Sequence, residues 1–253
     1  IFLNYLLLVN FLFTKEKDKD TINFWLSKNN IDSLQFKLKE ADTIKTLSVK
    51  FDRSKDSIID SLSISTITKS VIDLTEKFKL SADLPINKIS DSLIFIRNID
   101  SILIPFKSSI NSNSDEIMLD FDVKPQDDYS IYILPNAIID IRGGTNDTLS
   151  FNTLSQSLED YGNVYLNVIR DTESKYILQM VNSNSEIIKE YNNITNDGIY
   201  NFELIPPGKY LFRMIKDDNG NKIWDTGNYL QKIQPEDVYY FSNEYWYCIG
   251  HYI

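Results

Sequence analysis

Apolar and polar side chains alternate along most of the chain after residue 21. Residues 34–38 read LQFKL and residues 46–51 read TLSVKF, so apolar side chains occupy every second position. A period of two places the apolar side chains of a segment on one face, which is typical of half-buried strands in antiparallel sheets. The pattern predicts strands at residues 22–26, 34–38, 46–51, 62–67, 78–80, 93–96, 102–106, 117–121, 129–134, 148–154, 164–168, 176–181, 186–191, 199–204, 210–215 and 238–241.

The segments between these strands carry Asp, Asn, Ser and Lys, whose side chains suit tight turns. No amphipathic segment of three helical turns interrupts them, and residues 135–140 predict only a single helical turn. Ile, Tyr, Phe and Thr are abundant while Ala, Gln and Arg are scarce, which favours strands over helices. The sequence therefore predicts an all-β protein built as two tandem antiparallel β-sandwiches.

A turn at residues 160–162 separates two sets of predicted strands. We assign residues 28–158 to the first sandwich and residues 160–245 to a smaller second one, and leave the tail 246–253 unassigned. Residues 1–27 are interpreted as the end of an upstream domain or as entry strands. The apolar run at residues 1–13 is too short to span a bilayer as a helix and lacks a basic segment before it. A targeting or anchor segment is the alternative interpretation of this run.

Charge and rare residues exclude several classes of function. The net charge is −10 and no basic cluster interrupts the acidic surface, which would repel a phosphate backbone, so we expect no nucleic-acid partner. One cysteine, Cys248, and one histidine, His251, provide neither an intrachain disulfide nor a cysteine-based zinc site.

Two groups of motifs resemble known bacterial envelope proteins. Residues 202–213 read FELIPPGKYLFR, and this resembles the F-x-L-x-P-G-x-Y signature of prealbumin-like, carboxypeptidase-regulatory-like and CnaB-like sandwiches. Residues 217–230 with 234–236 resemble the C-terminal end of Bacteroidetes cell-envelope lipoproteins with an SbsA-type, bacterial Ig-like domain. Residues 129–135, 145–149 and 159–162 are similar to the same family, and the resemblance extends over residues 20–243.

The resemblance implies an Ig-like sandwich at residues 28–158 followed by a prealbumin-like or CnaB-like sandwich at residues 160–245. It also implies a location at the outer membrane, on its periplasmic or surface-exposed face, with other envelope or outer-membrane proteins as partners. Contact with the membrane would then run only through an N-terminal lipid anchor, whose cysteine this sequence lacks. Fold alone does not supply an activity.

One loop has the spacing of a cation site. Its oxygen-bearing positions one, three, five, seven and nine, in the numbering of an EF-hand loop, are Asp217, Asn219, Asn221, Ile223 and Asp225. Asn228 stands where a bidentate Glu is usual, and Lys222 stands where a Gly is usual. The loop is therefore interpreted in two ways, as a calcium site or as an Asx-rich turn whose side chains bond their own backbone. Calcium is the one cofactor considered, and the other interpretation has no cofactor.

Catalytic motifs are lacking, because the sequence has no Gly-rich phosphate loop and no partner for its single His or Cys. A pair of carboxylates that cleaves sugars needs no motif, but no pair is singled out. We predict that the chain is not an enzyme. Asp-Ser/Thr-aliphatic triplets, which resemble O-glycosylation sites of exported Bacteroidetes proteins, place the acceptor hydroxyl at Thr21, Ser33, Thr43, Ser57, Ser61, Ser92, Ser101 and Thr148.

Aromatic residues crowd the last part of the second sandwich. They are Trp224, Tyr229, Tyr239, Tyr240, Phe241, Tyr245, Trp246 and Tyr247. Alternating aromatics usually fill a sandwich core, which is the interpretation we favour for them and for Trp25. The function predicted from these observations is a non-catalytic structural or interaction module that docks to envelope proteins. The alternative is a glycan- or ligand-binding module that uses exposed aromatic rings.

Overall fold

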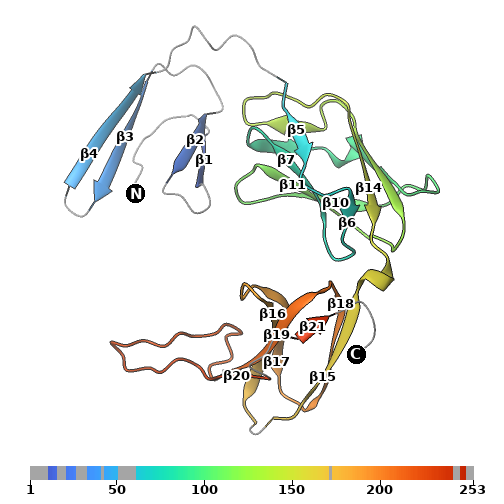
Figure 1. The fold of residues 1–253 in the computed structure, drawn as a ribbon. Helices are drawn as coiled ribbons and strands as arrows, with labels where there is room; N and C mark the ends of the chain where they lie inside the picture. Colours follow the sequence, from blue (N-terminus) through green and yellow to red (C-terminus); the bar gives the residue numbers. More distant parts are fainter. Residues whose placement is uncertain are drawn as a thin grey trace. The chain divides into compact units, whose positions relative to one another are not determined.

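The computed structural model describes residues 11–15, 21–26, 33–40, 43–50, 61–170, 173–241 and 246–248 (Figure 1). Strands make up nearly all of the regular structure, and two single 3-10 turns, η2 (Asp91–Leu93) and η3 (Leu158–Asp160), make up the rest of it in these segments. All strand pairs but one in the described segments are antiparallel. The predicted all-β class is thereby confirmed. The chain divides into two compact units, residues 1–156 and 157–253. The exact bounds given to the two domains from the sequence stay predictions.

The first unit contains two four-stranded sheets. One has the strand order β10 (Phe106–Ile110), β11 (Glu116–Phe121), β7 (Phe78–Ala82), β5 (Ile64–Thr66). The other has the order β6 (Val71–Ile72), β14 (Leu149–Ser155), β12 (Asp128–Ile133), β9 (Ile94–Arg97), with β6 parallel to β14. A small third sheet pairs β13 (Ile138–Asp140) with β8 (Ile86–Ile89).

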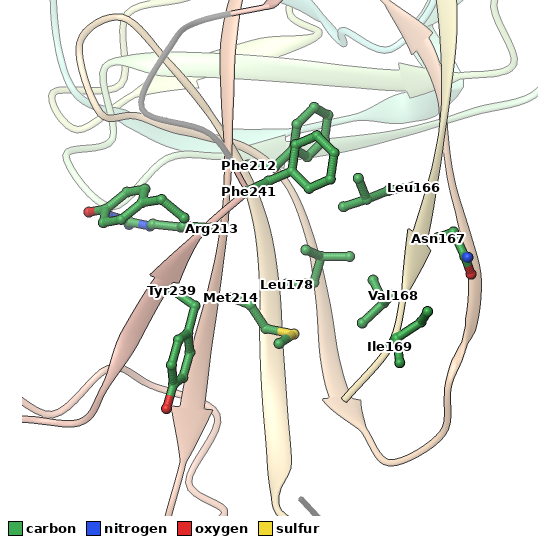
Figure 2. A pocket seen from close by; sticks show the side chains of 11 residues that line it. Leu166, Asn167, Val168, Ile169, Leu178, Phe212, Arg213, Met214, Tyr239 and Phe241 are labelled. Atoms are coloured by element: carbon green, nitrogen blue, oxygen red, sulfur yellow. The ribbon is translucent and has the colours of Figure 1, made fainter. Parts of the chain in front are cut away.

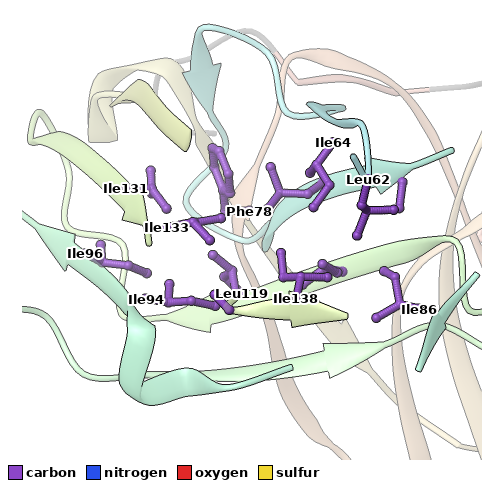
Figure 3. Packing of buried hydrophobic residues seen from close by; sticks show 14 of the residues in the cluster. Leu62, Ile64, Phe78, Ile86, Ile94, Ile96, Leu119, Ile131, Ile133 and Ile138 are labelled. Atoms are coloured by element: carbon purple, nitrogen blue, oxygen red, sulfur yellow. The ribbon is translucent and has the colours of Figure 1, made fainter. Parts of the chain in front are cut away.

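The core of the first unit lies between the two four-stranded sheets (Figure 3). Alternate residues of β7 and β11, such as Phe78 and Leu119, are buried, and so are Ile96 on β9 and Ile131 on β12. Each such side chain contributes about 1.5–3 kcal/mol when it leaves water. Burial also raises the pKa of Tyr129, whose hydroxyl oxygen accepts the N–H of Lys124 at 2.7 Å.

Two hairpins precede this core. β1 (Phe11–Lys15) pairs with β2 (Ile22–Leu26), and β3 (Ser33–Glu40) pairs with β4 (Thr43–Lys50). Each pair is a two-stranded sheet of its own in the described part of the chain, and the buried core of the first unit begins at Leu62. Most of the apolar run at residues 1–13 lies outside the described residues.

The second unit is an unequal sandwich. Its smaller sheet pairs β15 (Gly162–Val168) with β18 (Gly198–Ile205). Its larger sheet has the order β17 (Ile187–Ile194), β16 (Lys175–Asn182), β19 (Gly208–Asp217), β20 (Val238–Tyr240). Buried side chains of both sheets form the core, including Leu166, Leu178, Phe202 and Phe212. Phe202 and Phe212 meet edge to face at 5.1 Å between ring centroids.

The last described strand, β21 (Trp246–Cys248), pairs with the same edge of β19 as β20 does. Ile215 of β19 pairs with Val238 of β20, and Tyr210 of β19 pairs with Trp246 of β21. Since β16 pairs with residues 210–217 of β19, and both short strands have partners within that range, both must use the other edge of β19. Residues 246–248, which the sequence left unassigned, therefore join the larger sheet.

Two local predictions are wrong. The segment predicted as a strand at residues 102–106 makes one isolated bridge, between Leu103 and Arg97, and the strand β10 begins only at Phe106. Residues 135–140 are not a helical turn: Asn136 has a φ of 65°, which reverses the chain, and Ile138 then begins β13. The periodicity of the sequence did not identify β10, because this strand is mostly polar, and did not identify β13, because three residues are too few to show a period.

Candidate functional site

A long arm, residues 218–237, connects β19 to β20 and contains most of the predicted calcium loop. Asp217, the last residue of β19, is buried at the base of this arm. Its Oδ1 accepts the N–H groups of Gly220 at 2.7 Å and Asn221 at 3.1 Å, and its Oδ2 accepts the N–H of Lys222 at 3.0 Å. One carboxylate thus satisfies three consecutive backbone donors of a turn, which is a strong local constraint.

The remaining predicted ligands bond to one another and to the loop backbone. The amide nitrogens of Asn219 and Asn221 both donate to Asp225 Oδ2, and Asn221 Oδ1 accepts the N–H of Ile223 at 2.8 Å. This arrangement has the features of the Asx-rich turn interpretation. No group of three or more His, Cys, Asp and Glu side chains that could hold a metal ion occurs among the described residues. Calcium binding by this loop stays a prediction.

Glu236 completes the base of the arm, and the sequence did not single it out. It is buried, its Oε1 accepts the N–H of Asp218 at 2.9 Å, and its Oε2 accepts the N–H of Asp225 at 3.0 Å. The indole N–H of Trp224 donates to the Glu236 carbonyl oxygen at 3.2 Å. We call Asp217 and Glu236 the carboxylate clasp. Glu236 was missed because it lies beyond the twelve-residue window of the calcium motif.

An ion pair lies beside the clasp, between Lys216 Nζ and Asp218 Oδ1 at 3.1 Å. The hydrogen bond and charge of Asp218 raise the pKa of the Lys216 ammonium group.

Several aromatic residues that we expected in the core are exposed instead. Tyr229, Tyr239, Tyr240, Phe241 and Trp224 all have substantial exposed area. They lie on the arm, on the short edge strand β20 and, for Phe241, directly after that strand. Trp25 is half-buried and donates its indole N–H to Thr14 Oγ1 at 3.2 Å. The side chains of residues 245–247 lie outside the described part.

An apolar groove opens on one side of the second sandwich, between β15 and the pair β19–β20 (Figure 2). Its volume is about 150 Å³. Leu166 and Val168 of β15 line one wall, and Phe212, Met214 and Tyr239 line the opposite one. Among the described residues β15 pairs only with β18, so its other edge borders the groove.

A polar row fixes Arg213 on the larger sheet beside this groove. Arg213 Nε donates to Gln179 Oε1 at 2.8 Å, and Gln179 Nε2 donates to Glu190 Oε2. Gln179 is almost fully buried at the centre of this row, while Glu190 at its end is exposed.

Six of the predicted glycosylation acceptors are described and exposed: Thr21, Ser33, Ser61, Ser92, Ser101 and Thr148. Their modification stays a prediction, and Ser57 lies outside the described residues. No helix in the described segments is long and apolar enough to cross a membrane.

Comparisons with known proteins show only distant likeness. No family model and no curated protein matches the sequence. Native α-2-macroglobulin from Escherichia coli, domains MG0-NIE-MG1, is 10% identical over 75% of this chain and 74% of its own, with a TM-score of 0.34. The BSP domain of a biofilm-associated protein is 9% identical over 64% of this chain and 27% of its own, with a TM-score of 0.24.

A DUF4785 family protein from Legionella pneumophila is 12% identical over 69% of this chain and 56% of its own, with a TM-score of 0.21. These identities and TM-scores assign neither a family nor a function to the chain.

Proposed function

We propose that this chain is a non-catalytic interaction module of the bacterial cell envelope that docks to other envelope proteins. The observation that carries the proposal is the open side of the second sandwich, where one edge of β15, unpaired among the described strands, borders an apolar groove. Unpaired strand edges are templates for pairing with another chain, and sandwiches commonly use them for recognition.

The groove fits an extended partner strand. Such a strand would add to β15 through backbone hydrogen bonds and would place alternate apolar side chains against Leu166, Phe212 and Met214. The smaller sheet has two strands and the larger sheet has four along its main path, so an added strand would cover core side chains that now border the groove.

Glycan binding is the second candidate, because Tyr239, Tyr240 and Phe241 border the groove and are partly exposed. Flat rings of this kind stack on sugars. A sugar also needs several hydrogen-bonding groups, and the groove has only Asn167 and Arg213 besides the tyrosine hydroxyls. The aliphatic lining therefore favours a peptide partner over a glycan.

The cellular setting of the proposal comes from the motif resemblance to Bacteroidetes lipoproteins. It places the module at the outer membrane, on its periplasmic or surface-exposed face, with outer-membrane proteins as the partners. The net charge of −10 fits a partner other than nucleic acid.

Photo-crosslinking in a cell that makes the protein tests the docking proposal. A benzophenone amino acid replaces Tyr239 in the groove, and the matched control replaces Tyr132 on β12, since their exposed fractions are 44% and 42%. Docking predicts a crosslink to an envelope protein from position 239 and none from position 132. If neither position crosslinks to protein and Tyr239→Ala abolishes binding to a glycan array, the glycan candidate replaces docking.

A further inference from the structure

The arm, residues 218–237, ends in a closed turn of defined shape (Figure 1). Asn228 and Ile233 exchange two backbone hydrogen bonds, at 2.9 and 3.0 Å, and Lys232 N–H donates to the Tyr229 carbonyl oxygen at 3.2 Å. The side-chain oxygen of Asn228 accepts the N–H of Gln231 at 3.1 Å. The four residues 229–232 are thus held as a tight loop whose side chains point outward.

The most exposed large apolar side chains of the described segments lie on this loop. Tyr229 is 95% exposed and Leu230 is 90% exposed, and Ile233 at the base of the loop is 56% exposed. Single exposed apolar residues are ordinary on a protein surface. Two adjacent ones on a fixed turn at the end of an arm form a convex apolar tip, and such features mark contact sites.

The tip also differs from the rest of the chain in charge. Residues 226–235 contain one charged side chain, Lys232, although the whole chain has a net charge of −10. Asp225 and Glu236 are bonded to each other at the base of the arm, so residues 226–235 are the part that projects, and three to four extended residues per side would reach roughly 10–15 Å. That reach exceeds one Debye length at physiological salt, so the acidic body repels only weakly what the tip touches.

We propose that Tyr229 and Leu230 insert into the interfacial region of a phospholipid bilayer, with Lys232 at the level of anionic headgroups. Tyrosine has an apolar ring and a polar tip, which suits the boundary between headgroups and acyl chains. A lysine beside it keeps its charge in water and attracts acidic lipids. A bilayer receives a convex tip without a preformed pocket, whereas a protein would need a cavity of matching shape.

The area of this contact sets its strength. The apolar surface of three side chains is at most comparable to one myristoyl chain, whose partition constant is on the order of 10⁴ M⁻¹. The tip would therefore bind membranes reversibly and orient the second unit rather than hold it permanently. This proposal does not rest on docking through the β15 groove.

Vesicle co-sedimentation with the full chain tests the proposal. The probes are vesicles of phosphatidylethanolamine with phosphatidylglycerol, and vesicles of phosphatidylcholine alone. The double variant Tyr229→Ser/Leu230→Ser should lower the partition constant at least tenfold. A matched double variant, Tyr165→Ser/Ile199→Ser, changes exposed residues of the same unit and should leave the partition constant unchanged. Lys232→Glu should weaken binding about five- to tenfold on the anionic vesicles and little on the zwitterionic ones.

Fluorescence gives a second measurement that depends on depth. Tryptophan placed by Tyr229→Trp should be quenched by lipids brominated on the acyl chain, and tryptophan placed by Tyr165→Trp should not be. Failure of the native chain to sediment with either vesicle overturns the proposal. Equal losses in the two double variants overturn it as well, because the contact would then not be at the tip.

Discussion

Two buried carboxylates decide the shape of the arm at the scale of single residues. Asp217 and Glu236 together accept five backbone N–H groups from residues 218–225, on the side of the arm that leaves β19. The Asn221 N–H also donates to Asn219 Oδ1 at 2.9 Å, whereas the other four donors depend on the carboxylates. An unsatisfied donor costs about 1–3 kcal/mol where it is shielded from water.

We expect Asp217→Ala to lower the free energy of unfolding of the second unit by about 1–3 kcal/mol, because the N–H groups of Gly220 and Lys222 lose their acceptor while that of Asn221 keeps Asn219 Oδ1. This change in the free energy of unfolding is measured by urea titration, with tryptophan fluorescence as the signal. Asp218→Ala is the control, because its carboxylate is 60% exposed and pairs only with Lys216, so its loss should cost less than about 1 kcal/mol. Equal effects of the two variants would contradict the role given to the clasp.

The same urea unfolding experiment distinguishes the two interpretations of the Asp217 loop. The calcium interpretation expects millimolar calcium to raise the unfolding midpoint, and expects the rise to vanish in Asp225→Asn. The Asx-turn interpretation expects no shift with calcium in either protein. Magnesium at the same concentration controls for ionic strength.

Gly227 shows how a backbone angle fixes the arm. Its φ is +77°, and an added Cβ would lie 2.7 Å from the Ile233 carbonyl oxygen and 2.7 Å from the Pro235 nitrogen. Both contacts are to backbone, so no side chain can move aside to relieve them.

We expect Gly227→Ala to shift the arm and to cost about 2–3 kcal/mol, through strain at positive φ together with the clash. Gly143→Ala is the control, since Gly143 has a φ of +93° but nothing lies within 4 Å of its added Cβ. Gly143→Ala should lower the free energy of unfolding by about 1 kcal/mol, because the positive φ is its only source of strain. Backbone amide chemical shifts of residues 225–235 would report the displacement, and unchanged shifts in Gly227→Ala would contradict it.

At the scale of elements, the smaller sheet of the second unit depends on one buried ring. Phe202 of β18 contacts Phe212 at 5.1 Å and Tyr191 at 5.3 Å, both in edge-to-face geometry. This aromatic cluster joins the two sheets of the sandwich.

Phe202→Ala should destabilise the second unit by about 3–5 kcal/mol, through lost burial and the cavity left behind. Ile199→Ala on the same strand is the control, because Ile199 is 68% exposed and should change stability by less than about 0.5 kcal/mol. A thermal melt of each variant, followed by near-ultraviolet circular dichroism, distinguishes them. A small effect of Phe202→Ala would show that the sheets are held together elsewhere.

Period-two alternation identified the elements with a continuous apolar face. The predicted strands at residues 129–134 and 164–168 correspond to β12 and β15 within one or two residues, because both pack one face on a core. β13 and β6 were missed, since two or three residues are too few to show a period. The groove beside β15 could not be foreseen, because it depends on which strands pair, and a single strand does not encode its neighbours.

The arm was predicted only in part for a similar reason. Its Asx-rich base is visible in the sequence, and the bonds made by Asp217 follow from local spacing. Glu236 acts from eighteen residues away from its partner Asp218, a separation that no local motif covers. Tyr229 was expected in the core because aromatics in strands usually are, but the loop that contains it packs on neither sheet.

At the scale of the whole molecule, the two sandwiches have separate cores. The buried cluster of the first unit lies within residues 62–138, and the buried cluster of the second lies within residues 166–212. Neither cluster includes a residue of the other unit. Each core is therefore closed within its own stretch of chain, which is the usual requirement for independent folding.

We expect the chain to unfold in two cooperative steps, one for each unit, because each buried cluster of described residues lies within one unit. Phe78→Ala should lower only the midpoint of the first unit, and Phe202→Ala only that of the second, each by about 3–5 kcal/mol in free energy. Hydrogen exchange read by mass spectrometry assigns each step to its peptides. A fragment of residues 157–253 should also retain the midpoint that the second unit has in the full chain. A single transition that both variants shift equally would mean that the units stabilise each other, and the second unit could then not act as a separate contact module.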